Sequence, residues 1–191
     1  MTSKIKVNIL ADGGDNSIIT SDGAGSFTAS SSLASSVQSV GGLQNTPAFC
    51  VTLSSNQSVS DATDTKIQFT NVITDTASAY DNSTNYRWTC PSGGAGTYIL
   101  YGQCVLNGDG AATFVEGRFE FRINGSNYQR NAWNDYNNYG RNRTMVTSIM
   151  ADISVGDYIE GYTNFNYTGS SGELASGSKH TLMQGYKLIG A

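Results

Sequence analysis

The stretch from Thr97 to Leu106 constrains the fold more than any other part of the chain, because it is apolar on both sides of a predicted strand. Successive side chains of a strand point to opposite faces. One face holds Tyr98, Leu100, Cys104 and Leu106, and the other holds Ile99, Tyr101 and Val105. The first face can fill the core of a two-layered β-protein, and the second needs a separate cover.

Two covers are open for Ile99, Tyr101 and Val105. One is a neighbouring subunit, and the other is a longer loop of the same chain. Burying the three side chains would contribute roughly 5–8 kcal/mol before the costs of association. The three residues are therefore candidates for a subunit interface.

Segments with strand-like alternation recur from Pro47 onward, separated by turn residues. The expected strands are Ala48–Leu53, Lys66–Thr74, Tyr86–Cys90, Thr97–Leu106, Phe114–Ile123, Thr144–Ile153, Asp157–Phe165 and Thr181–Ile189. In Phe114–Ile123 one face holds Val115, Phe119, Phe121 and Ile123, and the other holds Glu116, Arg118, Glu120 and Arg122. This pattern predicts one face on a core and one in solvent or a polar interface. About eight strands in one domain predict an all-β fold, either a double-sheet sandwich or a jelly roll.

Residues 1–46 have a different composition from the rest of the chain. Residues 1–10 alternate Lys or Asn with Ile or Val, which predicts a short strand rather than the apolar core of a signal peptide. Residues 11–46 are rich in Gly, Ser and Asp, and such a segment cannot bury enough apolar surface to fold alone. We expect an extended anchoring arm over 1–46 and a head domain over 47–191.

Charge and hydropathy exclude several kinds of partner. The net charge of −4 argues against nucleic acid, whose phosphates require a basic surface. No apolar run reaches the 18 or so residues of a membrane-spanning helix, so no membrane insertion is expected. Cys50, Cys90 and Cys104 lack metal-ligand spacing, and we expect free core thiols.

The sequence contains little that predicts catalysis or metal binding. His180 is the single histidine, and no Gly-x-Ser-x-Gly motif occurs, so we expect neither a Ser-His-Asp site nor a histidine metal site, and no cofactor or metal is expected. Two alternatives stay open. The Asp and Glu residues could include a glycosidase pair. The turns Asp61–Asp64 and Asn107–Gly110 hold oxygen ligands that could bind calcium, although Asx residues are also common in turns for backbone reasons.

A stretch of aromatic, amide and arginine residues from Tyr128 to Arg143 is the candidate recognition site. Its candidate ligand-binding residues are Trp133, Asn134, Asp135, Tyr136, Tyr139, Arg141 and Arg143. Flat aromatic rings with directional hydrogen-bonding groups suit a sugar, a protein or an acidic group. The alternative, weighed equally, is a long hairpin loop whose aromatic rings pack against a neighbouring subunit.

Several motifs resemble the globular domain of complement component 1q, in the tumour-necrosis-factor-like jelly-roll superfamily. Phe69, Asp75 and Tyr80 match the start of that family's signature, and Gly96, Tyr98 and Leu100 match its end. Trp88 stands one place late, and Gly102 replaces the usual final aromatic residue. Residues 47–49, 155–157 and 185–188 resemble the first strand, a Gly-Asp turn and the closing strand of the family.

The resemblance implies a compact homotrimer that recognises other macromolecules and has no enzyme activity. The opening residues 2–7, the Gly/Ser/Asp-rich arm and residues 81–87 look like structural proteins of tailed phages, especially aquatic ones such as cyanophages. We therefore expect a virion protein, a fibre tip or a head decoration, that contacts other virion proteins through residues 1–46 and that recognises a host-surface glycan or protein or cements the capsid. The alternative is a secreted recognition module of complement or cytokine type, and a fibre-associated polysaccharide depolymerase is a third.

Overall fold

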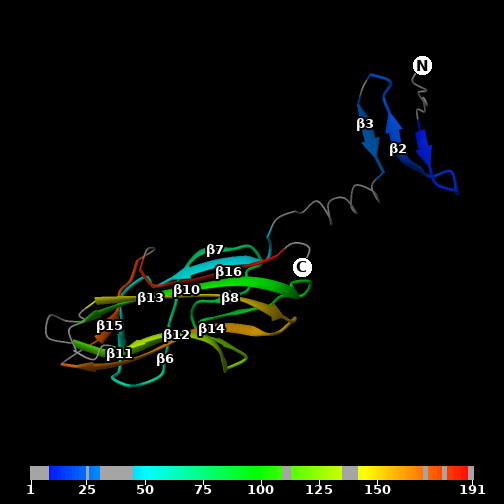
Figure 1. Cartoon of the computed structure of the whole chain (residues 1–191). Coiled ribbons are helices and arrows are strands. Elements are labelled where there is room, and N and C mark those ends of the chain that lie inside the picture. Colours follow the sequence, from blue (N-terminus) through cyan, green and yellow to red (C-terminus); the bar gives the residue numbers. More distant parts are fainter. Residues whose placement is uncertain are drawn as a thin grey trace, which may run out of the picture. The chain divides into compact units, whose positions relative to one another are not determined.

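The computed structural model describes residues 9–24, 26–30, 45–108, 113–134, 142–169, 172–177 and 180–188 (Figure 1). The chain divides into two compact units, Met1–Gln44 and Asn45–Ala191. The described ranges contain strands and turns, and no helix in them is long and apolar enough to cross a membrane.

The first unit contains a three-stranded antiparallel sheet within the segment expected to be an extended arm. Its strands are β1 (Ile9–Ala11), β2 (Ser17–Ser21) and β3 (Phe27–Ala29). Two aspartates close the turns: Asp12 Oδ1 accepts the N–H of Gly14 at 2.8 Å, and Asp22 Oδ1 accepts the N–H of Ala24 at 2.7 Å. Thus the residues that suggested an irregular arm instead form Asx turns between strands.

The second unit, the head, is built from two sheets stacked as layers (Figure 1). The first sheet contains β4 (Ala48–Thr52), β5 (Gln57–Val59), β7 (Asn71–Asp75), β10 (Gly96–Gly108), β13 (Asn142–Ile153), β15 (Gly172–Leu174) and β16 (Leu182–Lys187). The second contains β6 (Thr65–Lys66), β8 (Tyr80–Asp81), β9 (Arg87–Thr89), β11 (Thr113–Ile123), β12 (Ser126–Asn134) and β14 (Tyr158–Thr168). Strand β10 is central, because it pairs with β13, β15 and β16.

The core lies between β10 of the first sheet and β11 of the second. The alternation predicted for β10 is confirmed: Tyr98, Leu100, Cys104 and Leu106 are fully buried. Phe119 and Phe121 are also fully buried, and a Cβ added to Gly102 would lie 2.2 Å from the ring of Phe119. A side chain larger than that of glycine does not fit at position 102, because Phe119 already fills that space.

The expected strand Lys66–Thr74 is wrong in one respect, because it is two strands in different sheets. Strand β6 pairs with β14, and β7 pairs with β4. Ile67 and Phe69 are fully buried where the chain crosses between the layers, whereas Val72 and Ile73 are exposed on β7. The alternation therefore predicted the burial of Ile67 and Phe69 correctly, but it ends where the chain passes from one sheet to the other.

Four strands of the head were missed, namely β5, β8, β12 and β15. Three of them have only two or three residues. Strand β12 has nine, and most of them belong to the stretch Tyr128–Arg143, which was predicted to be a surface recognition stretch or a long hairpin loop. It pairs with β11 alone, and all its residues except Trp133 are exposed, so it carries no burial pattern.

The three cysteines are free. Cys90 and Cys104 are buried in the core, and Cys50 is half-buried on the outer side of β4. Desolvation raises the pKa of the thiol of each, so the thiols are held in their neutral form.

Candidate functional site

The outer face of β4, β10, β13 and β16 in the first sheet, turned away from the core, combines apolar side chains with almost no charge. Cross-strand pairing brings its residues into rows: Ile99 lies between Met150 and Tyr186, and Gln103 lies between Val146 and Leu182. We call this surface the apolar face; it comprises Ile99, Tyr101, Val105, Val146, Met150, Leu182 and Tyr186.

The apolar face is partly open within the described chain. Met150 is 61% exposed, Val146 40% and Tyr186 37%, whereas Ile99, Tyr101 and Val105 are half-buried. Of the described outward-pointing residues of β4, β10, β13 and β16, Asp152 alone is charged, and it accepts a hydrogen bond from Thr97 Oγ1 at 2.6 Å. A hollow of about 210 Å³ lies on this side over β4 and β16, lined in part by Ala48, Cys50 and Tyr186.

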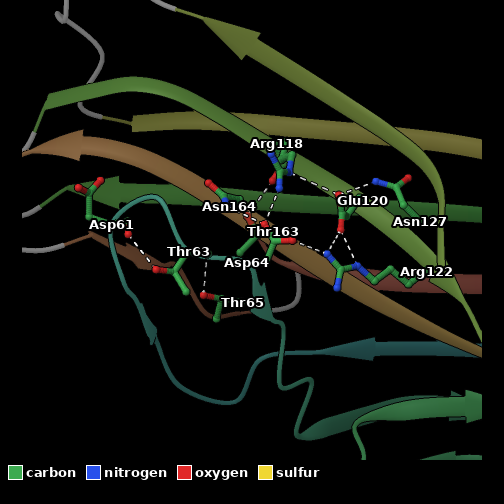
Figure 2. A network of polar contacts seen from close by, with 10 residues as sticks. All are labelled: Asp61, Thr63, Asp64, Thr65, Arg118, Glu120, Arg122, Asn127, Thr163 and Asn164. Carbon is green, nitrogen blue, oxygen red and sulfur yellow. Dashed lines mark hydrogen bonds and ion pairs between the residues drawn. The ribbon is translucent and has the colours of Figure 1, made fainter. Parts of the chain in front are cut away.

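The outer face of the second sheet is of the opposite kind. We call it the charged face; its centre is Arg118, Glu120 and Arg122 on β11, with Arg130 on β12 and Tyr162 and Asn164 on β14 beside them. Figure 2 shows the segment that carries Asp61, Thr63 and Asp64 running beside these strands. The polar side predicted for residues 116–122 is therefore a polar interface with another part of the same chain.

We call residues 61–64 the covering segment. Asp64 links it to two strands, β11 and β14 (Figure 2). Its Oδ1 accepts hydrogen bonds from Arg118 Nη2 and from Asn164 Nδ2, the latter at 2.7 Å. Its Oδ2 accepts one from Arg122 Nη2 at 2.6 Å. The amide of Asn164 and then the two guanidinium groups hold the pKa of Asp64 below its usual value, because each interaction favours the ionised carboxylate.

Glu120 is buried beneath the covering segment, with 1% of its surface exposed. Its Oε1 accepts a hydrogen bond from Arg122 Nε at 2.5 Å, and its Oε2 accepts one from Asn127 Nδ2 at 2.8 Å. Arg118 Nε lies 3.4 Å from the same Oε2. A buried carboxylate requires such compensation, since an unpaired charge at this depth would be strongly destabilising.

The network around Tyr162 contains equal numbers of positive and negative side chains. Lys66 Nζ donates to Glu160 Oε1 at 2.5 Å, and the guanidinium of Arg122 lies 3.8 Å from the ring centroid of Tyr162. The cations Lys66, Arg118 and Arg122 are matched by the anions Asp64, Glu120 and Glu160. The network is therefore suited to holding the chain together rather than to attracting an ion.

The two turns considered for calcium have other roles. Asp61 Oδ1 accepts the N–H of Tyr167 at 2.8 Å, and both oxygens of Asp64 are engaged as above. Asn107 donates to Glu173, while Asp109 and Gly110 lie outside the described residues. In the described ranges, no group of three or more His, Cys, Asp or Glu side chains could hold a metal ion.

The predicted recognition stretch is described only in part. Asp135, Tyr136, Tyr139 and Arg141 lie outside the described residues. Asn134 ends β12 and is exposed, and Arg143 is exposed near the start of β13.

Trp133 and Arg143 come together across the edges of the two sheets. The Arg143 guanidinium lies 5.1 Å from the centroid of the Trp133 ring, a cation–π distance. Trp133 is half-buried against the core, and its Nε1 would lie 3.1 Å from a Cβ added to Gly117. Most of this ring therefore faces the protein rather than a ligand.

The roles of Asp64 and Lys66 in completing the charged face were not predicted from the sequence. Asp64 was considered only as a metal ligand, and Lys66 only as the start of a strand. The alternating charges at 116–122 were the signal that could have predicted these roles, because charged side chains on a sheet face require partners from elsewhere in the chain.

We predict that Asp64→Asn lowers the free energy of unfolding by about 1 kcal/mol at pH 7, since the pairs are partly exposed. The folded-state pKa of Asp64 is lowered, so its stabilisation is present above the unfolded pKa of about 4 and is lost as the pH falls through the folded value. Urea unfolding at pH 7 and at pH 3 should show a smaller acid loss in the variant than in the native chain.

Glu116→Gln is the matched control, because Glu116 has no hydrogen bond or ion pair with the described part of the chain. It should leave unfolding at pH 7 unchanged. An Asp64 variant as stable as this control at pH 7 would contradict a clamping role for the network.

We predict that Trp133→Ala lowers the free energy of unfolding by about 2 kcal/mol, because a half-buried ring packed on the core is removed. Trp133→Phe should retain more than half of that loss. Tyr128→Ala is the control on the same strand, since Tyr128 is 50% exposed and should change stability little. Equal stability of the Trp133 and Tyr128 variants in chemical denaturation would return Trp133 to the ligand-binding hypothesis.

Comparison with known proteins bears on the fold. No family model matches the sequence, and no curated protein matches it. Three solved structures illustrate the likeness. Murine APRIL at pH 5.0 has a TM-score of 0.54 and 13% identity, covering 74% of this chain and 98% of that one. Eiger TNF from S. frugiperda has a TM-score of 0.53 and 12% identity, covering 75% and 92%.

The third is the globular domain of the zebrafish complement 1qA protein, with a TM-score of 0.51 and 13% identity, covering 74% of this chain and 98% of that one. At these identities the likeness concerns the fold alone. The all-β jelly-roll prediction is confirmed: the chain has the fold shared by tumour-necrosis-factor-like proteins and complement 1q globular domains.

Proposed function

We propose that the protein is a non-enzymatic homotrimer in which the apolar face of each head packs against its neighbours. We further propose that this trimer is a structural protein of a tailed-phage virion, a fibre tip or a head decoration. In this proposal residues 1–46 join the head domain, residues 47–191, to other virion proteins. The head itself recognises a host-surface glycan or protein, or cements the capsid.

The apolar face is the observation that carries the trimer. An exposed apolar patch with a polar surround is typical of a protein–protein interface, and charged residues are depleted at the centre of such interfaces. Met150, Val146 and Tyr186 supply exposed apolar surface beside the half-buried Ile99 and Tyr101. The hollow over β4 and β16 can accept a side chain from a second copy.

The charged face also supports a trimer in which each head packs against its neighbours through the apolar face. Its network is internally paired, so its groups require no partner from another subunit. Packing it against a neighbour would desolvate ionised groups with no new compensation. The head thus has one side suited to burial and one suited to solvent or to a ligand.

The virion setting rests on the character of residues 1–46 and on the likeness of that segment to phage structural proteins. The fold fits a secreted recognition module of complement or cytokine type equally well, and that module is the alternative. The two differ in what the N-terminal unit does: in a virion it binds other particle proteins.

We predict that the full chain has a solution mass of three times 20.3 kDa, independent of concentration over a tenfold range. Met150→Arg should dissociate it, because a charge would be placed in an apolar contact while the monomer fold is left intact. Light scattering with circular dichroism measures both properties.

Val155→Arg is the matched control, since Val155 is 56% exposed but lies in the turn between β13 and β14. It should leave the trimer unchanged. A native chain that stays monomeric at both concentrations would sink the trimer proposal.

We predict that a chain lacking residues 1–46 remains folded but is not incorporated into particles, because the attachment segment is missing. The measurement is co-sedimentation with particles assembled in its presence, with the full chain as reference. Normal incorporation of the shortened chain would rule out the attachment role of this segment.

A further inference from the structure

A hollow of about 170 Å³ lies on the charged face. It is lined by Glu116, Gly117, Arg118, Arg130, Ala132, Trp133 and Asn164. Ala132 pairs by register with Arg118, and Asn164 pairs with Arg118 from the other side. The hollow exists because the small Ala132 side chain stands among long ones on three adjacent strands.

Within the described part of the chain, two charged groups at this hollow are unpaired. Arg130 and Glu116 have no hydrogen bond or ion pair with the described residues, although every other ionised group at the centre of the charged face is matched. Arg130 pairs in register with Glu120, and Glu116 pairs with Asn134. Arg130 and Glu116 therefore lie on either side of the cross-strand row that holds Ala132. The hollow therefore presents a free guanidinium towards one end and a free carboxylate towards the other.

The remaining lining adds a hydrogen-bond acceptor and a fixed wall. Asn164 uses its Nδ2 on Asp64, and in the described chain its Oδ1 accepts no hydrogen bond. Arg118 is held in place by Asp64 and Glu120. Groups held by other interactions before a ligand arrives lose little freedom when it binds.

We propose that this hollow binds one acidic sugar residue of a polysaccharide. The free guanidinium of Arg130 suits the carboxylate of a uronic acid, which it can bind through two parallel hydrogen bonds. Glu116 and Asn164 Oδ1 accept hydrogen bonds from the ring hydroxyls. This proposal deepens the recognition part of the proposed function, since it names the ligand class, and it does not depend on the trimer.

Other ligand classes fit the hollow less well. A nucleic acid needs several uncompensated cations, and Arg118 and Arg122 are already neutralised by Asp64 and Glu120. A hard cation needs several oxygen ligands, and Glu116 is the single free carboxylate in the lining. The volume is below the range of enclosed small-molecule pockets, which favours one residue of a longer chain lying across an open surface.

The test is isothermal titration of the full chain with oligogalacturonate, oligomannuronate and a hyaluronan tetrasaccharide, with neutral maltotriose as the reference. We expect at least one acidic probe to bind and maltotriose not to bind at the same concentrations. Arg130→Gln should weaken that binding by about tenfold or more, the usual effect of losing a charge-assisted pair of hydrogen bonds. Glu116→Gln should weaken it less, because an amide oxygen still accepts from a hydroxyl.

Arg87→Gln is the matched control, because it removes the same charge from a guanidinium that lies 4.2 Å from the Tyr158 ring centroid, away from the hollow. It should change the affinity less than twofold. Absence of binding by all three acidic probes, equal binding of maltotriose, or equal weakening by the Arg87 variant would each overturn the proposal. Light scattering on the same samples keeps the two proposals separate: a trimer that binds no probe refutes only the sugar site, and a monomer that binds one refutes only the trimer.

Discussion

The contact between β10 and β11 through Gly102 is the constraint on which the rest of the head depends. Phe119 occupies the space that a side chain at position 102 would need, so the two central strands approach closely at this point. Tyr98, Leu100, Cys104 and Leu106 are then buried on one side of β10. Because alternation along a strand is strict, the same contact sends Ile99, Tyr101 and Val105 outward. The apolar face is thus a geometric consequence of the core.

The two outer faces of the head differ in whether the chain itself covers their side chains. The second sheet covers its outer charges with a segment of its own chain, and Asp64, Glu120 and Glu160 neutralise the cations there. The first sheet has no comparable cover over Met150 and Tyr186 in the described residues. Apart from Arg130 and Glu116, the charged face is satisfied internally, whereas the apolar face is not, and this contrast supports the proposal that heads associate through the apolar face.

Sequence reasoning worked where burial is strictly periodic. The alternation in residues 97–106 and 116–123 predicted both faces of β10 and of most of β11, and the two central strands define the fold. At the start of β11 the prediction was wrong, because a bulge between Phe114 and Glu116 buries Phe114 in the core in place of Val115. It failed at β12, whose residues are mostly exposed and therefore show no periodic burial. It also failed at Lys66–Thr74, where the chain passes from one sheet to the other although the alternation of buried residues extends to Phe69. The partners of Arg118 and Arg122 come from Asp64, more than fifty residues earlier, and no local pattern encodes such a distance.

The balance of charge on the charged face also determines how a ligand would reach it. Since three cations and three anions cancel within a few ångströms, the face produces little electric field beyond a Debye length of about 8 Å at physiological salt. Encounter with an anionic polymer is then governed by ordinary diffusion rather than by electrostatic steering. Any strong attachment would have to come from several weak contacts made at once, because linked sites raise the effective concentration of one another. A head with the proposed sugar site would therefore bind firmly to a surface that repeats the acidic sugar and only weakly to a single free sugar.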